Sequence, residues 1–561
     1  MPTRTGLHVS FPGMMSRVSL LAIILAATPH LAVAQDAATS TPEAEASTPE
    51  TETSTRDEAE VTALKDEVVQ AVEGNEKLVQ EMIDSIFSFG ELAFQEVETS
   101  RYITDILEQN GFTIERGMAG MPTAWTATWG SGEPVIALGS DIDAIPKASQ
   151  MPGVAYHQPI IEGAPGHGEG HNSGNAVNVV AALAVKDIME RENISGTLML
   201  WPGVAEELLG AKAYFVREGM FEDVDATIFT HVSDNLNTTW GQANGTGLVS
   251  VEYTFEGESA HSASRPWQGR SALDAVDLMN IGWNIKREHL RPDQRSHFVI
   301  TNGGDQPNVV PSTASVWYFV REMDQENIQK NYDTLNTIAE AAAMMTDTTV
   351  SRQVVGTAYP RHFNKPMAEA AFENIQAVGL PEWSEDDQAF AKAIQASVDA
   401  DQDGLETELD ELGAPLETPT SGGSDDIGDI SWNMPTITIR YPSNAPGLPG
   451  HHWANAMTMA TPIAHKGGVA GAKVVAMTTL DLLLKPDLMQ QAQDYFDNEQ
   501  TADEQYTPFI TADDQPAITK NVEIMAEFRP QMEEFYYDPE QYDTYLEQLG
   551  VTYPTLEPPA R

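Results

Sequence analysis

Carboxylate and imidazole side chains gather in four short segments in the first half of the chain. They are Asp141-Ile142-Asp143, Glu169-Gly170-His171, Glu206-Glu207 and His231. Carboxylate oxygens are hard donors and imidazole nitrogens are borderline donors, and together they can bind divalent metal ions. In a pair such as Glu206-Glu207, one carboxylate can bind metal while its neighbour takes a proton from metal-bound water. The pattern therefore indicates metal-assisted hydrolysis.

These residues follow segments that are predicted to be strands. Residues 134–140 and 196–201 are apolar runs of strand length, 228–230 is a shorter run, and 176–189 has a helical pattern. Strand, helix and strand in succession predict a parallel sheet, and ligands bind such sheets at the carboxyl ends of the strands. Each segment alone is commonly a surface or core feature, whereas their shared placement favours one site.

Length and charge limit what this protein can be. A chain of 561 residues exceeds the usual size of one domain, so we expect at least two. Asp and Glu number 84 against 31 Lys and Arg, a formal net charge of −53, and repulsion disfavours nucleic acid or an anionic membrane as a partner. A hydrated surface adapted to salt and a funnel for cationic substrates both fit this charge.

The N-terminal region has the pattern of an export signal. Ser16-Arg17 precedes an apolar run over 18–27 and the small residues at 32–34, which predicts a signal peptide over 1–34, with translation starting at Met1, Met14 or Met15. An uncleaved anchor is the alternative, but the run is short for one. Residues 35–60 have the composition of a disordered linker. We expect an exported protein, periplasmic or secreted, that is free of the membrane after cleavage.

Cysteine is absent from the whole chain. Structural disulfides and lipid attachment at a cysteine are therefore excluded.

The remaining segments suggest further units. A helical pattern runs from 61 to 86, and the carboxylate-rich stretch 382–417 suggests an exposed insertion. The acidic tail over 485–561 has helical stretches at 518–528 and 539–549, which we expect to pack on the main domain. A smaller α+β domain is predicted from the three segments that follow residue 243: an alternating strand at 245–256, a helix at 272–289 and a strand at 314–320.

Longer motifs make a resemblance specific. They are Glu91-Leu92-Ala93-Phe94-Gln95-Glu96, Asp141-Ile142-Asp143-Ala144-Ile145-Pro146, Pro165-Gly166-His167-Gly168-Glu169-Gly170-His171-Asn172 and Ala205-Glu206-Glu207. In order and spacing the chain resembles the co-catalytic zinc peptidase family of aminoacylases and folate-cleaving carboxypeptidases. It looks most like the aminobenzoyl-glutamate hydrolases of the amidohydrolase branch, over residues 61–484. The resemblance implies cleavage of the amide bond of an N-acyl or N-aroyl amino acid or a dipeptide-like substrate.

The resemblance also implies a fold. The expected class is α/β, with a mixed, largely parallel sheet and helices on both faces, plus a smaller inserted α+β dimerisation or lid domain. The expected boundaries are 61–243 and 357–484 for the catalytic domain, 244–356 for the inserted domain, and 485–561 for an acidic C-terminal extension.

Two divalent metal ions are implied by the same family pattern. Their ligands would be Glu169 as the bridge, Glu207 and His451 on one ion, and His171 and His231 on the other. Glu206 would be the general base, and Asp143 would orient a metal-bound imidazole. His452 is the alternative to His451.

One position departs from the branch. Glu169 stands where the branch carries a bridging cysteine. A bridging carboxylate can hold two ions about 3.5–4 Å apart. Zinc is the expected metal, and the harder oxygen donor makes manganese an alternative. A catalytically inactive relative that binds metal is the competing hypothesis.

The inserted domain supplies the remaining residues of the family pattern. His261 matches a histidine that reaches across a homodimer to stabilise the oxyanion in the partner's site. Asn308 and Arg321 match positions that hold the substrate's free carboxylate in glutamate-releasing members. An ordinary surface charge is the other interpretation of Arg321. For His167 we favour a structural role.

Overall fold

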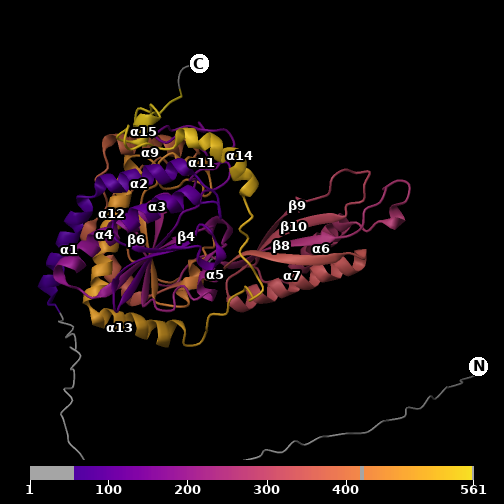
Figure 1. The fold of residues 1–561 in the computed structure, drawn as a ribbon, viewed down its shortest axis with the longest axis horizontal. Helices are drawn as coiled ribbons and strands as arrows, with labels where there is room; N and C mark the ends of the chain where they lie inside the picture. The colour runs from indigo at the N-terminus through magenta and orange to yellow at the C-terminus, as the bar shows by residue number, and fades with distance from the viewer. Residues whose placement is uncertain (1–55, 417–421, 559–561) are drawn as a thin grey trace, which may run out of the picture. The chain divides into compact units, whose positions relative to one another are not determined.

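A seven-stranded mixed sheet forms the centre of the main domain (Figure 1). In spatial order its strands are β1 (Thr113–Arg116), β2 (Trp125–Ser131), β4 (Gly196–Gly203), β3 (Val135–Asp141), β5 (Ala226–Ser233), β13 (Thr436–Pro442) and β6 (Asn237–Thr238). This computed structural model describes residues 56–416 and 422–558. The predicted signal peptide and residues 35–55 of the predicted linker lie outside the described residues, whereas residues 58–60 of that linker are helical.

The four central strands, β4, β3, β5 and β13, are mutually parallel. The outer pairs are antiparallel, β1 with β2, β2 with β4, and β6 with β13. Ile136, Ala137 and Leu138 of β3 are all fully buried, as expected for a strand covered on both faces. The predicted mixed α/β class is confirmed, and the carboxyl ends of the four parallel strands meet at one edge.

Five helices in the described part of the main domain contact strands of this sheet, namely α3 (Val97–Gln109), α4 (Gly174–Glu192), α8 (Lys365–Val378), α10 (Ile427–Ser431) and α12 (Pro462–Leu484). Helices α1 (Glu58–Glu73) and α2 (Glu76–Phe89) pack on α4 and α12, and α5 (Lys212–Arg217) packs on α10. The short helix α11 (Trp453–Ala456) precedes α12. The two longest of these helices, α4 and α12, pack against each other and against β3 and β5. Within the described residues, α12 alone has the length and composition of a membrane span, and 89% of its most apolar window is buried inside the protein.

The helical pattern predicted from 61 to 86 is interrupted in the structure. Asp57 and Glu60 form a capping box that starts α1 at Glu58, before the first apolar residue of the pattern. The helix ends at Glu73, and Gly74, whose amide bonds to the carbonyl of Gln70, is its C-cap. The apolar spacing continues across this break because α1 and α2 both turn a buried face to the core.

The inserted domain is a four-stranded antiparallel sheet with two helices. In spatial order its strands are β11 (Thr349–Ala358), β8 (Gly247–Glu256), β10 (Thr313–Glu322) and β9 (Arg295–Asn302), and its helices are α6 (Ala272–Lys286) and α7 (Gln325–Thr346). The helices pack on each other and on β8 and β10. Strand β9 lies at the edge of the sheet, with most of its residues exposed.

Strand β11 joins the inserted domain to the turn that carries Glu206. The amide of Thr357 donates to the carbonyl of Leu209 at 2.8 Å. A Cβ at Gly356 would clash with the carbonyl oxygens of Leu208 and Leu209, so only glycine permits this approach. Nearby, the two-stranded ladder of β7 (Gly241–Gln242) and β12 (His362–Phe363) also connects the two parts of the main domain.

The C-terminal extension packs on the main domain through three helices, α13 (Pro486–Tyr495), α14 (Val522–Met532) and α15 (Tyr545–Gln548) (Figure 1). Arg529 pairs with buried Glu91 at 2.8 Å, and the amide of Tyr545 donates to Asp84 at 3.0 Å. The second predicted helical stretch, 539–549, is helical only over α15, and turns and bends precede that helix in the structure. The side chain of Asp538 accepts a hydrogen bond from the amide of Glu540 there, a local bond that favours a turn over a helix.

The region from 382 to 417 is less exposed than its composition predicts. It contains α9 (Glu385–Ser397), whose residues Phe390, Ala391 and Ile394 are fully buried in a small core. Glu385 and Asp386 of α9 are exposed, whereas Asp387 is buried and accepts a hydrogen bond from Lys466. The segment therefore combines an exposed acidic side with a buried apolar face that its composition does not reveal.

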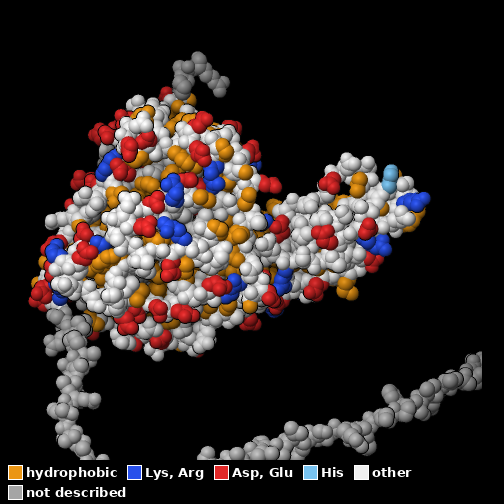
Figure 2. Space-filling model, in the orientation of Figure 1, with side chains coloured by type: hydrophobic (Ala, Val, Ile, Leu, Met, Phe, Trp, Pro, Cys, Tyr) orange, Lys and Arg blue, Asp and Glu red, His pale blue; other side chains and the backbone are white. Residues whose placement is uncertain are grey.

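Acidic side chains are scattered over the face of the molecule that Figure 2 shows, with fewer Lys and Arg between them. They do not gather there into a single patch. On this face the distribution favours a hydrated acidic surface over a funnel for cations.

Candidate active site

The four acidic and histidine segments meet at the carboxyl edge of the parallel strands. Asp141 is the last residue of β3, and Asp143 follows it. Glu206 and Glu207 form a short 3₁₀ turn after β4, and His231 lies near the end of β5. The loop before α4 supplies Glu169 and His171, and the segment after β13 supplies His451.

One group of possible metal ligands consists of Glu169, Glu207 and His451. The Nε2 atom of His451 lies 2.5 Å from Glu169 Oε2 and 3.5 Å from Glu207 Oε2. His451 adopts φ = 49°, a left-handed conformation that costs energy in a residue with a side chain and recurs at functional sites. The backbone is thus held in a strained form that brings this ring to the carboxylates.

A second group consists of Asp141, His171 and His231, whose potential ligand atoms all lie within 4.8 Å of one another. His231 Nε2 is 3.6 Å from Glu169 Oε1. Glu169 therefore has one oxygen facing each group, as a bridging ligand requires.

Asp143 organises both glutamates and a histidine. Its two oxygens accept hydrogen bonds from the amides of Glu206 at 3.2 Å and Glu207 at 3.0 Å. His171 Nδ1 lies 3.2 Å from the carbonyl oxygen of Asp143 and 3.6 Å from its carboxylate. This leaves His171 Nε2 directed to the cluster, with Glu206 Oε2 at 4.0 Å.

Burial and neighbouring charges shift the pKa values of the three glutamates in different directions. Burial, with the charges of Asp141 and Asp425, raises the pKa of Glu206 well above its ordinary value, and burial beside Glu169 does the same for Glu207. Burial also opposes ionisation of Glu169, but the hydrogen bond from His451 and the nearby histidines outweigh it and lower the pKa of Glu169. The cluster contains more negative charge from its carboxylates than its own positively charged side chains can neutralise.

The pKa values of His231 and His171 are shifted in opposite directions. Burial and the charge of Arg440 lower the pKa of His231 to about 4, which keeps its imidazole neutral, the form that binds metal. Burial opposes protonation of His171, yet the surrounding carboxylates raise its pKa well above 6.5.

The residues present fit two divalent ions. His171 Nε2 and Glu207 Oε1 are buried atoms without a hydrogen-bond partner within the described residues. Buried polar atoms are normally satisfied, so atoms left unpaired beside a surplus of negative charge suit cations. Carboxylate and imidazole donors in this number are those that zinc and manganese accept.

Two further histidines of the motifs have other partners. His452 Nδ1 accepts from the amide of Ala454 at 3.3 Å and caps α11, so His451 is the one of the pair that faces Glu169. His167 is buried with Nε2 3.1 Å from the carbonyl of Ile86, and burial lowers its pKa to about 3. Its contact is with α2, as a structural role requires.

The predicted residues of the inserted domain are not joined to the cluster. His261 is exposed, and its Nδ1 accepts from the amide of Ala263 at 3.2 Å. Asn308 is exposed, and its carbonyl accepts from the amide of Ser262 at 3.1 Å. Over 56–416 and 422–558, neither makes an ion pair or hydrogen bond with a cluster residue.

Arg321 is half-buried at the end of β10. Its Nη1 donates to Ser424 Oγ at 2.8 Å, and its guanidinium lies 5.3 Å from the ring of Phe319. Burial lowers its pKa, and it forms no ion pair within the described part of the chain. A half-buried guanidinium without a carboxylate has donors to offer a ligand.

Sequence reasoning gave no role to several residues of this region. Lys212 of α5 is fully buried, with Nζ 2.6 Å from Asp141 Oδ1 and also in contact with Asp426. Asp425 lies within 4.8 Å of Asp141 and Glu206. The sequence did contain an indication for Asp425 and Asp426. They are a pair of adjacent acidic residues shortly after two glycines, just as Glu206 and Glu207 are such a pair after a strand. Lys212 gave none, since a lysine in a short helix is normally exposed.

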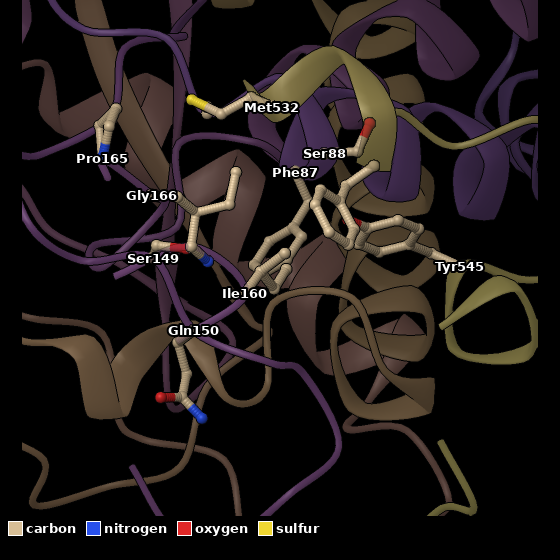
Figure 3. Close-up of a pocket in the computed structure, with 12 residues that line it drawn as sticks. Phe87, Ser88, Ser149, Gln150, Ile160, Pro165, Gly166, Met532 and Tyr545 are labelled. Carbon is tan, nitrogen blue, oxygen red and sulfur yellow. The ribbon is translucent and has the colours of Figure 1, made fainter. Parts of the chain in front are cut away.

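A small cavity lies behind the motif loop (Figure 3). Figure 3 shows Met532 and Tyr545 of the C-terminal extension together with Phe87, Pro165 and Gly166. Its volume of about 30 Å³ is room for about one or two water molecules. A substrate does not fit there, so the cavity marks the contact between the extension and the loop that leads to Glu169.

The fold and the cluster are those expected of a class, the two-domain α/β hydrolases. Comparisons with known proteins agree. A family profile described as a peptidase dimerisation domain (M20_dimer) matches residues 246–345. The chain is 35% identical over 449 residues to one of the subunits of p-aminobenzoyl-glutamate hydrolase of Escherichia coli (strain K12), covering 75% of this chain and 92% of that protein. The chain belongs to the M20 peptidase family.

Two other relatives extend the comparison. Xaa-Arg dipeptidase of Homo sapiens is 27% identical over 430 residues, covering 73% of this chain and 87% of that protein. A solved structure from methicillin-resistant Staphylococcus aureus, provisionally named an aminohydrolase, has a TM-score of 0.53 at 18% identity, covering 75% of this chain and 100% of that one. It shows a shared fold.

Proposed function

We propose that this protein is a metal-dependent amidohydrolase that cleaves the amide bond of an N-acyl or N-aroyl amino acid. The observation that carries the proposal is the placement of Glu169 between two ligand groups, His171 with His231 and Glu207 with His451, with Glu206 beside them. Two divalent ions bound there would supply Lewis-acid activation of a water molecule and of the amide carbonyl. We expect zinc, and manganese is the alternative that the oxygen-rich donor set favours.

Proton transfer falls to Glu206. It is buried, its pKa is raised, and its backbone is fixed by Asp143. A carboxylate of this kind can take a proton from the attacking water and return it to the leaving nitrogen. Asp143 acts through Glu206 and His171 and is a positioning residue.

Substrate binding involves the inserted domain in this proposal. Arg321 offers its guanidinium, and Asn308 its amide, to the free carboxylate of the amino-acid half, where bidentate pairing gives both affinity and orientation. His261 would reach the oxyanion from a second copy of the chain, since no bond joins it to the described cluster of its own chain.

A homodimer follows from this assignment, and the surface supports it. Strand β9 and helix α6 expose apolar side chains on the inserted domain, namely Ile281, Ile285, Phe298, Val299 and Ile300. An exposed edge strand with apolar residues is suited to pairing with another copy. Light scattering should give a dimer, and a double variant, Ile285→Glu with Val299→Glu, should give a monomer.

We also propose export to the periplasm or exterior, on the N-terminal pattern alone. Fractionation of cells expressing the full chain, with sequencing of the mature N-terminus, tests this. Recovery of uncleaved protein in the cytoplasm would contradict it.

A substrate panel tests the proposed reaction. p-Aminobenzoyl-glutamate, the substrate named for the Escherichia coli relative, heads the panel, followed by N-acyl amino acids and dipeptides. We expect release of a free amino acid by mass spectrometry, loss of turnover after chelation, and its return with zinc or manganese. Tight metal binding without hydrolysis of any member would instead support an inactive, metal-binding relative.

A further inference from the structure

Asp141 is a buried carboxylate with one oxygen unaccounted for. It is 1% exposed at the end of β3. Its Oδ1 accepts from Lys212 Nζ at 2.6 Å, whereas Oδ2 has no hydrogen-bond partner within the described residues. Leaving a buried charged oxygen unpaired is costly, so native structures normally satisfy such atoms.

The missing partner is indicated by the neighbouring histidines. Asp141, His171 and His231 offer ligand atoms within 4.8 Å of one another. His171 Nε2 is a second buried atom without a partner within the described residues, and His231 Nε2 faces Glu169. Donor atoms of these side chains therefore lie close together without hydrogen bonds between them.

A purely structural role for Asp141 explains only one of its two carboxylate oxygens. Lys212 is shared between Asp141 and Asp426, and a Cβ at Gly203 would clash with Asp141 Oδ1, so the local packing is built for that ion pair. The pair accounts for Oδ1 and fixes the plane of the carboxylate. It does not account for Oδ2.

Another acidic group also includes Asp141, together with Glu206 and Asp425. Asp425, however, already has partners, since its Oδ1 accepts from the amide of Ile427 at 2.9 Å and its Oδ2 lies 3.6 Å from Arg361. The side with unsatisfied nitrogen is that of His171, so we place the function of Oδ2 there.

We propose that Asp141 is a ligand of the metal ion held by His171 and His231, with Glu169 as the fourth protein donor and Lys212 as a positioning residue for Asp141. Two imidazoles and two carboxylates make a donor set that suits zinc. The inference rests on the two-metal centre proposed above and adds one ligand to it.

Metal content tests this inference, with a matched pair of variants. Asp141→Asn and Asp426→Asn each remove one of the two carboxylates that Lys212 contacts, but only Asp141→Asn removes a charged donor from the metal. Dialysed full-length proteins are analysed by elemental mass spectrometry, and ion affinities are measured by competition with a chelator.

We expect two ions per chain in the unaltered protein and in Asp426→Asn. In Asp141→Asn, the affinity for one ion should fall by more than the roughly 10- to 100-fold that loss of an outer-shell partner costs. Equal loss in both variants, or unchanged affinity in Asp141→Asn, would overturn the inference and leave the two-metal centre in place. Fewer than two ions in the unaltered protein would overturn the proposed centre itself.

A measurement on the unaltered protein covers the case in which Asp141→Asn does not fold. Anomalous diffraction from zinc-loaded crystals should place an ion about 2.0–2.2 Å from Asp141 Oδ2. A carboxylate oxygen more than about 3 Å from both ions would contradict the assignment.

Discussion

The main domain and the inserted domain both carry residues of the proposed site, but they hold them in different ways. In the main domain, Asp143 and Glu206 are buried and tied together through backbone amides. In the inserted domain, His261 and Asn308 are exposed, and their hydrogen bonds are to their own neighbourhood. The first set is positioned by strand ends, which are rigid, and the second by loops.

This difference suggests that the two domains contribute different parts of the proposed site. In the proposed mechanism, the sheet would hold the metal ligands and the base in a fixed arrangement, so that a single chain could bind metal without the inserted domain moving. The proposed oxyanion stabilisation and carboxylate binding would depend on a second copy or on closure of the inserted domain. Variants in the two regions should therefore differ in what they lose.

The largest loss is expected from Glu206→Gln. Removing the base should lower kcat by roughly 10³- to 10⁴-fold while both ions stay bound, because Glu206 is not needed as a ligand. Steady-state kinetics and metal analysis measure the two effects. The matched variant Glu207→Gln should lower metal content instead, and equal metal loss in both would show that the two roles are not separate.

His261→Ala should lower kcat by about 10²- to 10³-fold with little change in KM, the effect of losing an oxyanion donor. The exposed residue His289 of the same domain provides the control, His289→Ala, which should keep full activity.

Mixed dimers sharpen the test of His261. A dimer of one Glu206→Gln chain and one His261→Ala chain retains one complete site if His261 acts across the interface. Random pairing of the two inactive variants should then restore roughly a quarter of full activity. No recovery on mixing would mean that His261 acts within its own chain or not at all.

Arg321→Met should raise KM by roughly 10- to 100-fold for substrates with a free carboxylate, the equivalent of about 1.5–3 kcal/mol for a hydrogen bond to a charged group. Amide analogues that lack this carboxylate serve as the control and should be cleaved equally by both proteins. A similar KM rise for these analogues would assign Arg321 to holding Ser424, its present partner.

The sequence predicted the cluster better than its surroundings. Glu207 and His231 could be proposed as ligands because they follow apolar runs of strand length, and strand length and burial are readable from such runs. Glu169 and His171 were indicated by their glycine-rich motif and its resemblance to the family pattern. His451 and His452 are distinguished only by the folded structure, because the backbone at His451 is left-handed and the side chain of His452 caps α11.

Long-range pairs could not be predicted in the same way. Lys212 meets Asp141 and Asp426 from segments 71 and 214 residues away in the chain. No local spacing encodes such a contact. Likewise, α9 has a buried apolar face within a carboxylate-rich stretch. The overall composition of the stretch does not reveal this face, because it does not depend on the order of the residues.

The smallest expected effect concerns stability in acid, which should originate in the buried histidines of the main domain. Burial lowers the pKa of His362 in β12 to about 4, below the 6.5 expected when unfolded. Between these values the unfolded chain binds the proton and the folded chain does not. Stability should therefore fall as pH drops from 6.5 toward 4, by about 1–2 kcal/mol by pH 5.

His362→Gln removes that titration and should lessen the loss of Tm between pH 7 and pH 5, because glutamine has no charged form to exclude. Glutamine can still bond to the hydroxyl of Tyr495, which lies 3.1 Å from His362 Nε2. The control His289→Gln changes an exposed histidine of the inserted domain and should leave the Tm profile unaltered. If the two variants gave the same profile, acid sensitivity would not follow burial, and the contrast between the two domains would not extend to stability.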